Sequence, residues 1–351
     1  MTNARTPSRR TTAARPAAAL VLAAASAGAL AQTETSRRGV VGFLDRAPSG
    51  FIAPPIDPTG SDLVTQELAP GVYALVNTKP PADNSGFVVG EHGVLVIDSH
   101  LTREMAELIQ TRVREVTDKP ILYLVNTNYH GDHTYGNAWF PDETVIIGHE
   151  ETRRLMDELR SDELRTMIAA ARGRSVLGQV EIRLPDVTFT DRMTIDLGGR
   201  IVEIHHFGHA NTPGDAVVFV PEASVAWTGN FVIGEGFIPP LLDGRPRDYL
   251  NTLAAFSAEL SPRTIIPGHG LPTDHEHVGM NLNYLNDLLA GVEDARARGL
   301  TLEQTLAEFE LPAAYRFEAG TPFEPFDPFV AGLHRLHVKD AYLEAEALGG
   351  E

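Results

Sequence analysis

The chain has 351 residues, of which 43% are hydrophobic and 22% are charged, and these proportions indicate a globular protein with a substantial core. Its 47 acidic and 29 basic residues give a formal charge of −18, and such an acidic surface repels the phosphates of nucleic acids and of anionic membranes. The complete absence of cysteine excludes disulfide bonds and thiolate metal ligands.

The N-terminal residues have the pattern of a signal peptide. Four arginines, Arg5, Arg9, Arg10 and Arg15, precede an apolar stretch from Ala17 to Ala31, which predicts a signal peptide over residues 1–31 with cleavage after Ala31. Its removal would leave 25 basic residues and a charge of −22. We therefore expect a periplasmic or secreted protein without stable membrane insertion. General secretory and twin-arginine export both stay open, and the alternative to a signal peptide is a disordered alanine-rich tail.

The rest of the chain divides into three parts. Residues 32–70, rich in Pro, Gly and Ser, predict an extended lead-in, and residues 71–275 alternate between strands and helices. The predicted strands lie at 71–76, 86–89, 94–98, 121–126, 145–148, 187–190, 193–196, 200–207, 216–220, 225–229 and 264–266. The predicted helices lie at 103–116, 150–172 and 249–260. Residues 276–351 predict a helical extension packed on the core, with helices at 278–289, 302–309 and 329–348; the aromatic segment 314–328 favours a packed connector over a lid.

A group of metal-binding side chains follows the apolar run 121–125. The sequence Asn128-Tyr129-His130-Gly131-Asp132-His133 places two imidazoles and a carboxylate within four positions, and Gly131 allows a tight turn. Neutral imidazole and carboxylate are good ligands for zinc and its neighbours, so the spacing predicts a metal site. The alternative is a surface loop in which these groups cap the following segment.

Four further motifs occur in a fixed order along the chain. The first is a β-hairpin over 86–99 that ends at Asp98 and Ser99. The second is the segment Gly208-His209-Ala210-Asn211-Thr212-Pro213-Gly214-Asp215. The third is the strand 225–229 with Asn230 after it, and the fourth is Ile265-Ile266-Pro267-Gly268-His269-Gly270.

Together these motifs resemble those of the metallo-β-lactamase superfamily, and the resemblance covers nearly the whole mature chain. It implies an α/β fold, a four-layer αββα sandwich with the C-terminal helical extension. The chain ending resembles exported members associated with quinoprotein and sulfur-oxidation systems. The family's nuclease branch is disfavoured, because nucleases need a basic track for their substrate.

The resemblance also implies roles for individual residues. The family's second ligand set would be Asp132, His133 and His269, with Asp98 supporting the ligand loop by hydrogen bonds. The first set would be Asn128, His130 and Asn211, and Asn230 replaces the metal-bridging aspartate. An amide oxygen is a weak neutral ligand, so we expect one metal ion, preferably zinc, and expect the three asparagines to line the pocket.

Neighbouring histidines could restore the first ligand set. His209 could turn toward the site, and of the adjacent His205 and His206 at most one can face it, because neighbouring residues of a strand point to opposite faces. The loop 234–247 either walls the site or packs on itself. Its Arg245 and Arg247 could orient an anionic substrate, although exposed arginines usually have no such role.

The leading hypothesis is a periplasmic hydrolase that cleaves a small ester, thioester or amide with metal-activated water. Asp132 and His130 are its candidate catalytic residues, with His130 as general base or as donor to the developing oxyanion. The first alternative is a non-catalytic binding protein whose metal site has decayed, and the second is a true class B β-lactamase. We expect a small molecule and no nucleic acid as the partner.

Overall fold

The computed structural model describes residues 56–171, 173–234, 237–317, 320 and 323–349, all within the unit that spans 42–351. The predicted signal peptide and residues 32–55 of the lead-in lie outside the described residues.

The first sheet has seven strands that follow one another in chain order. They are β1 (Leu63–Ala69), β2 (Val72–Asn77), β3 (Ser85–Val89), β4 (Val94–Ile97), β5 (Ile121–Asn126), β6 (Val145–His149) and β7 (Val187–Phe189). Pairing is antiparallel from β1 to β4 and parallel from β4 to β7. The parallel strands all end at one edge of the sheet, where the residues after β4 and β5 meet.

The second sheet has five strands in the order β12-β11-β10-β9-β8. Their bounds are β8 (Arg192–Asp196), β9 (Ile201–His205), β10 (Val217–Val220), β11 (Val225–Gly229) and β12 (Thr264–Pro267). Only the β11–β12 pair is parallel, which brings Asn230 after β11 and Gly268 after β12 to the same edge.

The two sheets pack face to face through a core of aliphatic side chains together with Phe189 and Trp227. Trp227 on β11 is 2% exposed, and its indole Nε1 donates a hydrogen bond to Ser85 O on β3 at 3.3 Å. Gly86 leaves the space for this ring, because a Cβ at that position would lie 2.2 Å from Trp227 Nε1. The sheets therefore approach each other closely at the Gly86–Trp227 contact.

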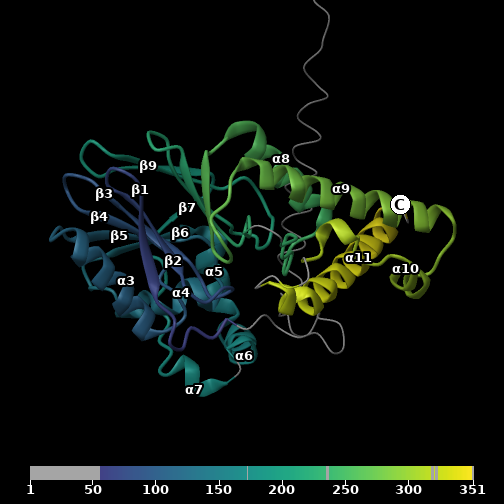
Figure 1. The fold of residues 1–351 in the computed structure, drawn as a ribbon, viewed down its shortest axis with the longest axis horizontal. Helices are drawn as coiled ribbons and strands as arrows, with labels where there is room; N and C mark the ends of the chain where they lie inside the picture. Colours follow the sequence, from purple (N-terminus) through teal and green to yellow (C-terminus); the bar gives the residue numbers. More distant parts are fainter. Residues whose placement is uncertain (1–55, 172, 235–236, 318–319, 321–322, 350–351) are drawn as a thin grey trace, which may run out of the picture. The chain divides into compact units, whose positions relative to one another are not determined.

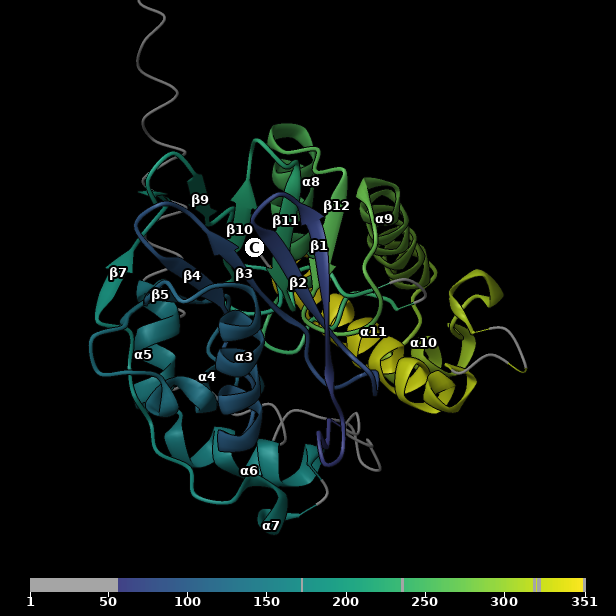
Figure 2. The ribbon, with the colours of Figure 1, turned by 60° about the vertical axis from the view of Figure 1, so that its left-hand side comes forward.

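Helices cover the outer face of each sheet (Figures 1 and 2). On the first sheet, α3 (Arg103–Val116) buries Met105, Ile109 and Val113 in one apolar cluster with strand residues. On the second sheet, α8 (Pro246–Glu259), α9 (His275–Ala297) and α11 (Asp327–Gly349) enclose another cluster. The predicted αββα arrangement with a C-terminal helical region is confirmed.

Most predicted elements occur close to their expected bounds, and two differ. The strand β1 lies inside the predicted lead-in. The sequence did not predict it, because only Leu63 among its residues is buried and the segment carries little hydrophobic periodicity. The helix expected at 150–172 is divided into α5 (Glu150–Glu158) and α6 (Arg160–Ala170), with Leu159 between them at φ −98° and ψ 13°. The other short helices are α4 (Gly131–Thr134), η1 (Tyr135–Trp139), α7 (Arg174–Leu177), η2 (Ala313–Tyr315) and η3 (Glu324–Phe326).

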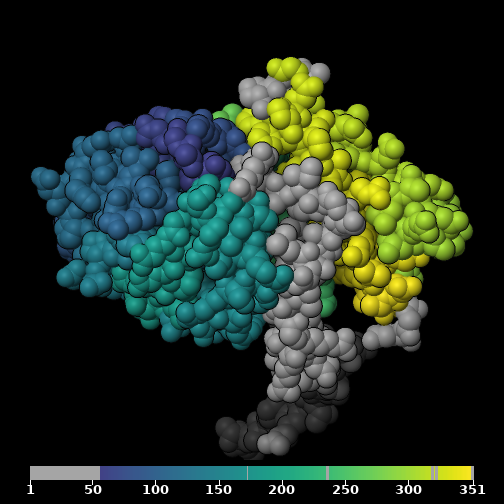
Figure 3. Space-filling view, turned by 90° about the horizontal axis from the view of Figure 1, so that it is seen from below, coloured from purple at the N-terminus to yellow at the C-terminus, as the bar shows by residue number. Residues whose placement is uncertain are grey.

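The C-terminal helices gather on one side of the described residues, opposite the first sheet and α3 (Figure 3). A buried polar network holds α11 in place: the hydroxyl of Tyr284 on α9 lies 3.0 Å from His334 Nδ1 and 2.8 Å from His337 Nδ1. His337 Nε2 lies 3.1 Å from the carbonyl oxygen of Pro240, in the loop between β11 and α8. The extension also includes α10 (Leu302–Glu308), which begins with a capping box at Thr301.

In the described part of the chain, no helix is both long enough and apolar enough to cross a membrane.

The contact between the sheets predicts the effect of a single methyl group. Gly86→Ala should lower the free energy of unfolding by roughly 1–3 kcal/mol, because the buried indole ring has no space to move away. Gly279→Ala on α9 is the matched control: its added Cβ meets no atom within 4 Å, so it should raise stability by about 0.5–1 kcal/mol. Urea denaturation of both variants measures these changes. Equal free energies of unfolding for Gly86→Ala and the wild type would contradict the close approach of the two sheets.

The polar network of the extension predicts a pH dependence. Burial lowers the pKa of His337 to about 3, well below the value of about 6.5 in an unfolded chain. The stability that neutral His337 contributes is therefore fully present above about pH 6.5 and is lost as the pH falls toward 3. Between pH 7 and pH 5, His337→Gln should lose less unfolding free energy than the wild type. His92→Gln, in the exposed turn between β3 and β4, should behave as the wild type does.

Candidate metal centre

The loop after β5 is held by a carboxylate at the end of β4. Asp98, at φ 58°, accepts hydrogen bonds from Thr127 N at 2.8 Å and from Thr127 Oγ1 at 2.7 Å. Its Oδ2 also lies 2.8 Å from His133 Nδ1. A hydrogen bond from Nδ1 fixes the orientation of the ring and directs Nε2 toward the space beyond the loop.

Four buried side chains converge next to this loop: Asp83, Asp132, His133 and His269. Each offers one potential ligand atom, and all these atoms lie within 4.8 Å of one another. His269 Nε2 is 3.4 Å from Asp132 Oδ2, and His133 Nε2 is 4.0 Å from Asp132 Oδ1. The structure thus brings together the three residues predicted as the second ligand set and adds Asp83 to them.

The second imidazole is fixed in the same way as the first. His269 Nδ1 donates to the carbonyl oxygen of Pro81 at 2.6 Å, which leaves Nε2 directed toward Asp132. Both rings therefore present Nε2 to the group and use Nδ1 for support by the protein.

The oxygen atoms of this group fit a metal ion. Both carboxylate oxygens of Asp83 and Oδ1 of Asp132 are buried without a hydrogen-bond partner. Burying a carboxylate costs free energy unless a partner or a cation compensates it. Two imidazole nitrogens and two carboxylates are a suitable donor set for zinc and similar divalent ions.

The pKa values of the group reflect this shortage of partners. Burial and the charge of Asp132 raise the pKa of Asp83 to about 8. Burial would also raise the pKa of Asp132, but His133 and His269 outweigh it and lower that pKa. Burial lowers the pKa of His133 and of His269. The nearby carboxylates outweigh this effect and raise both pKa values; the main one is Asp98 for His133 and Asp83 for His269. A bound cation would replace the protons that the imidazoles otherwise hold.

Sequence reasoning missed Asp83, and its contacts explain why. Asp83 lies in the segment between β2 and β3, and its position depends on the loop after β12. The backbone N–H of Asn84 donates to Gly268 O at 2.7 Å, and Asn84 Nδ2 donates to Pro267 O at 2.9 Å and Gly270 O at 2.8 Å. No local spacing signals contacts between segments so far apart in sequence. The only sequence signal is a lone Asp-Asn pair after two prolines.

The first predicted ligand set has a different environment. Asn128 Oδ1 accepts a hydrogen bond from His130 N at 2.9 Å, and Asn211 Oδ1 accepts one from Leu242 N at 3.0 Å. The amide oxygens of Asn128 and Asn211 are therefore used to hold the backbone of two loops.

His130 pairs with Asp243, a second residue that sequence reasoning missed. His130 Nε2 lies 3.3 Å from Asp243 Oδ2, and the Tyr129 hydroxyl donates to the same oxygen. Burial lowers the pKa of His130, but the hydrogen bond to Asp243 and the nearby charge of Glu163 outweigh it and raise that pKa to about 9. The contact with Asp243 therefore favours the protonated form of this ring.

Asn230 lies between the two groups, at the place where the resemblance puts a bridging carboxylate. Its Nδ2 is 3.3 Å from His130 Nδ1, and its Oδ1 is 3.1 Å from His133 Nε2. The amide therefore lies within hydrogen-bond distance of both rings, and it brings no charge.

The other predicted neighbours lie apart from the four-residue group. His209 Nε2 lies 3.0 Å from the backbone oxygen of Asp243, and His205 Nε2 lies 2.9 Å from Glu203. His206 stacks on His149 with ring centroids 3.9 Å apart.

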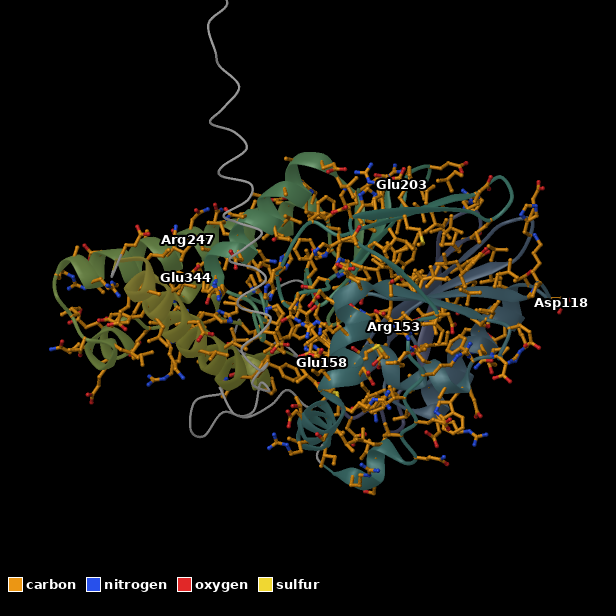
Figure 4. All side chains as sticks on the ribbon, turned by 180° about the vertical axis from the view of Figure 1, so that it is seen from behind. Asp118, Arg153, Glu158, Glu203, Arg247 and Glu344 are labelled. Carbon is orange, nitrogen blue, oxygen red and sulfur yellow. The ribbon has the colours of Figure 1, made fainter. Side chains whose placement is uncertain are left out.

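The two arginines of the loop 234–247 have other contacts. Arg245 is the N-cap residue of α8. Arg247 forms an ion pair with Glu293 at 2.9 Å and lies beside Glu344 of α11 (Figure 4). Phe237 of the same loop packs on Phe317, with ring centroids 4.8 Å apart, so the aromatic segment 314–328 contacts this loop.

Access to the group is uneven. The side chain of His269 is 11% exposed, whereas those of Asp83 and His133 are fully buried. Of the four side chains, that of His269 therefore lies nearest the surface of the described part of the chain.

Comparisons with known proteins agree with this geometry. The family model of the metallo-beta-lactamase superfamily matches residues 79–269. A linear primary-alkylsulfatase of Pseudomonas sp. (strain ATCC 19151) is 24% identical over 262 residues, or 63% of this chain and 48% of the relative, so the chain spans about half of that protein. The beta subunit of 2,4-dinitroanisole O-demethylase from Nocardioides sp. (strain JS1661) is 26% identical over 263 residues, or 72% of this chain and 74% of the relative.

Among solved structures, a metallo-beta-lactamase from Pontibacter korlensis has a TM-score of 0.53 at 19% identity, and the match covers 64% of this chain and all of the other. This similarity concerns the fold alone. The family model, however, covers more than half of the chain and extends from the segment before Asp83 to His269. The chain is a member of the metallo-beta-lactamase superfamily.

Proposed function

We propose that the protein is a metal-dependent hydrolase that uses one divalent ion, preferably zinc, to cleave a small ester, thioester or amide. The observation that carries this proposal is the convergence of Asp132, His133 and His269 on one point, with Asp132 Oδ1 buried and unpartnered. When bound, such an ion supplies Lewis-acid activation of water and of a carbonyl group. These three residues would hold it.

The contacts of the first ligand set support one ion over two. A second ion would need anionic or imidazole ligands near His130, but Asn128 and Asn211 use their oxygens on the backbone. His130 itself is paired with Asp243. The neutral Asn230 cannot offset the repulsion between two cations a few ångströms apart.

Of the two roles considered for His130, its environment supports that of proton donor. The raised pKa favours the protonated form of the ring, whose Nε2 is directed at Asp243 and whose Nδ1 lies beside the neutral Asn230. A protonated imidazole in this position can donate to negative charge that develops on the substrate oxygen. Asp132 would act as a metal ligand that also orients the attacking water.

The named relatives widen the range of substrates to be tested. One relative is an alkylsulfatase and the other a subunit of an O-demethylase for 2,4-dinitroanisole, so their substrates contain a sulfate ester and an aryl methyl ether. A substrate screen should therefore contain these two bonds beside carboxylic esters, thioesters, amides and β-lactams.

A non-catalytic binding protein is the second candidate. Asparagine at three usual ligand positions, together with the His130–Asp243 pair, supports it, because this half of the site no longer offers metal ligands.

The proposed function predicts the metal content of the protein and of two variants. The purified protein should hold close to one zinc ion per chain and hydrolyse at least one class in the screen. His269→Ala should lose both metal and hydrolysis, whereas His130→Ala should keep the metal and turn over roughly 100-fold more slowly. Elemental analysis and steady-state kinetics measure both, with His92→Ala as the control outside the site.

Each result has a separate meaning. Loss of metal from His130→Ala would assign His130 to the ligands and contradict the division of roles. One metal ion without hydrolysis of any class would favour the binding protein.

We also propose that the protein is periplasmic. The four arginines followed by the apolar stretch Ala17–Ala31 support export, and a mature charge of −22 fits a protein without a nucleic-acid partner. Expression of the full chain in a Gram-negative host should give a periplasmic product that begins at Gln32, which mass spectrometry can identify. A cytoplasmic product that retains residues 1–31 would contradict export.

A further inference from the structure

We infer that Asp83 is a fourth protein ligand of the metal ion, a role that none of the sequence motifs assigns to it. This inference rests on the proposed function in one respect, namely that the protein binds a metal ion at Asp132, His133 and His269.

The position of Asp83 is that of a ligand. Its Oδ1 lies 3.8 Å from His133 Nε2, and Asp83 belongs to the group whose potential ligand atoms all lie within 4.8 Å of one another. Two bonds of about 2.0–2.2 Å to one ion can span a separation of this size. The same oxygen lies 3.2 Å from Nδ1 of His269, the ring nitrogen that supports His269 and does not face the ion.

Neither carboxylate oxygen of Asp83 has a hydrogen-bond partner among the described residues. His269 Nδ1 lies 3.2 Å from Asp83 Oδ1, but it donates its hydrogen to Pro81 O at 2.6 Å. Asp83 is also 0% exposed, so its carboxylate cannot be solvated at the surface. A fully buried carboxylate that faces two imidazoles and another carboxylate is explained by a cation between them.

The surrounding backbone holds Asp83 at a fixed place. Asn84, the next residue, makes three hydrogen bonds to the loop that carries His269, and Pro81 O supports His269 itself. Gly268 permits this close packing, because a Cβ there would lie 2.8 Å from His133 Cε1. The ligand and its neighbours are thus positioned before any ion binds, as in a preorganised site.

A fourth ligand changes the character of the centre. Two carboxylates would offset the charge of a divalent ion, and Asp83, Asp132, His133 and His269 would all hold it. A water molecule or substrate would have to add to these four protein ligands. The donor set therefore suits an ion that accepts five or six ligands as well as four.

Substitution of Asp83 tests the inference by metal affinity. Asp83→Asn and Asp83→Ala should bind zinc more than about 100-fold more weakly than the wild type in competition with a chromophoric chelator. Losing a group that only supports a ligand typically costs about 10–100-fold. The matched control is Glu163→Gln, which removes a buried carboxylate that accepts a hydrogen bond from Gly131 N beside the site. The zinc affinity of Glu163→Gln should stay within about 10-fold of that of the wild type.

Two readouts separate coordination from folding. The visible spectrum of the protein loaded with Co²⁺ should change in Asp83→Asn and not in Glu163→Gln, because only a ligand alters the coordination of the ion. Without metal, Asp83→Asn should melt no lower than the wild type, because it removes an unpartnered buried carboxylate. Added zinc should raise its melting temperature less than that of the wild type.

The outcomes distinguish this inference from the proposed function. Equal zinc affinity and equal Co²⁺ spectra in Asp83→Asn and the wild type, with one ion bound to each, would overturn the role of Asp83 and leave the metal centre intact. A wild type that binds no ion would overturn both.

Discussion

Three hydrogen bonds to the carboxylate of Asp98 join the end of β4, the loop after β5 and the ring of His133. Two of them fix Thr127, where the loop leaves the strand, and the third fixes the ring that faces the metal position. The backbone of Asp98 has a positive φ, a conformation that Asp tolerates better than most residues. The parallel pairing of β4 and β5 brings these partners together, so the sheet register determines the orientation of a metal ligand.

The two halves of the site balance charge in different ways. Around His133 and His269, three carboxylate oxygens of Asp83 and Asp132 have no hydrogen-bond partner among the described residues, so this half could hold an external cation. Around His130, the raised pKa favours an imidazolium with Asp243 as its counterion. Neutral Asn230 joins the halves without adding charge. The arrangement is the basis of the proposal that this chain holds one metal ion in place of two.

Much of the fold could be predicted because its signals are local. The predicted helix 103–116 has the bounds of α3, since its apolar residues recur at helical spacing and Thr102 caps it. The strand β1 was missed because it is mostly exposed. In the site, Asp132 and His133 belong to one motif, but Asp243 meets His130 across 113 positions, and Pro81 meets His269 across 188. Such contacts depend on the packing of loops, which the spacing of residues along the chain does not determine.

The contact between His337 and Pro240 links the last helix to the loop that carries Asp243. The segment shared with the superfamily stops at His269, before α9 and α11, and begins at residue 79, after β1 and β2. A fragment cut to that segment would lack two strands of the first sheet. It would also expose the apolar face of the second sheet that α9 and α11 bury. We therefore expect a truncated variant to need the strands and helices from β1 to α11, together with Ile56, which is buried against α6.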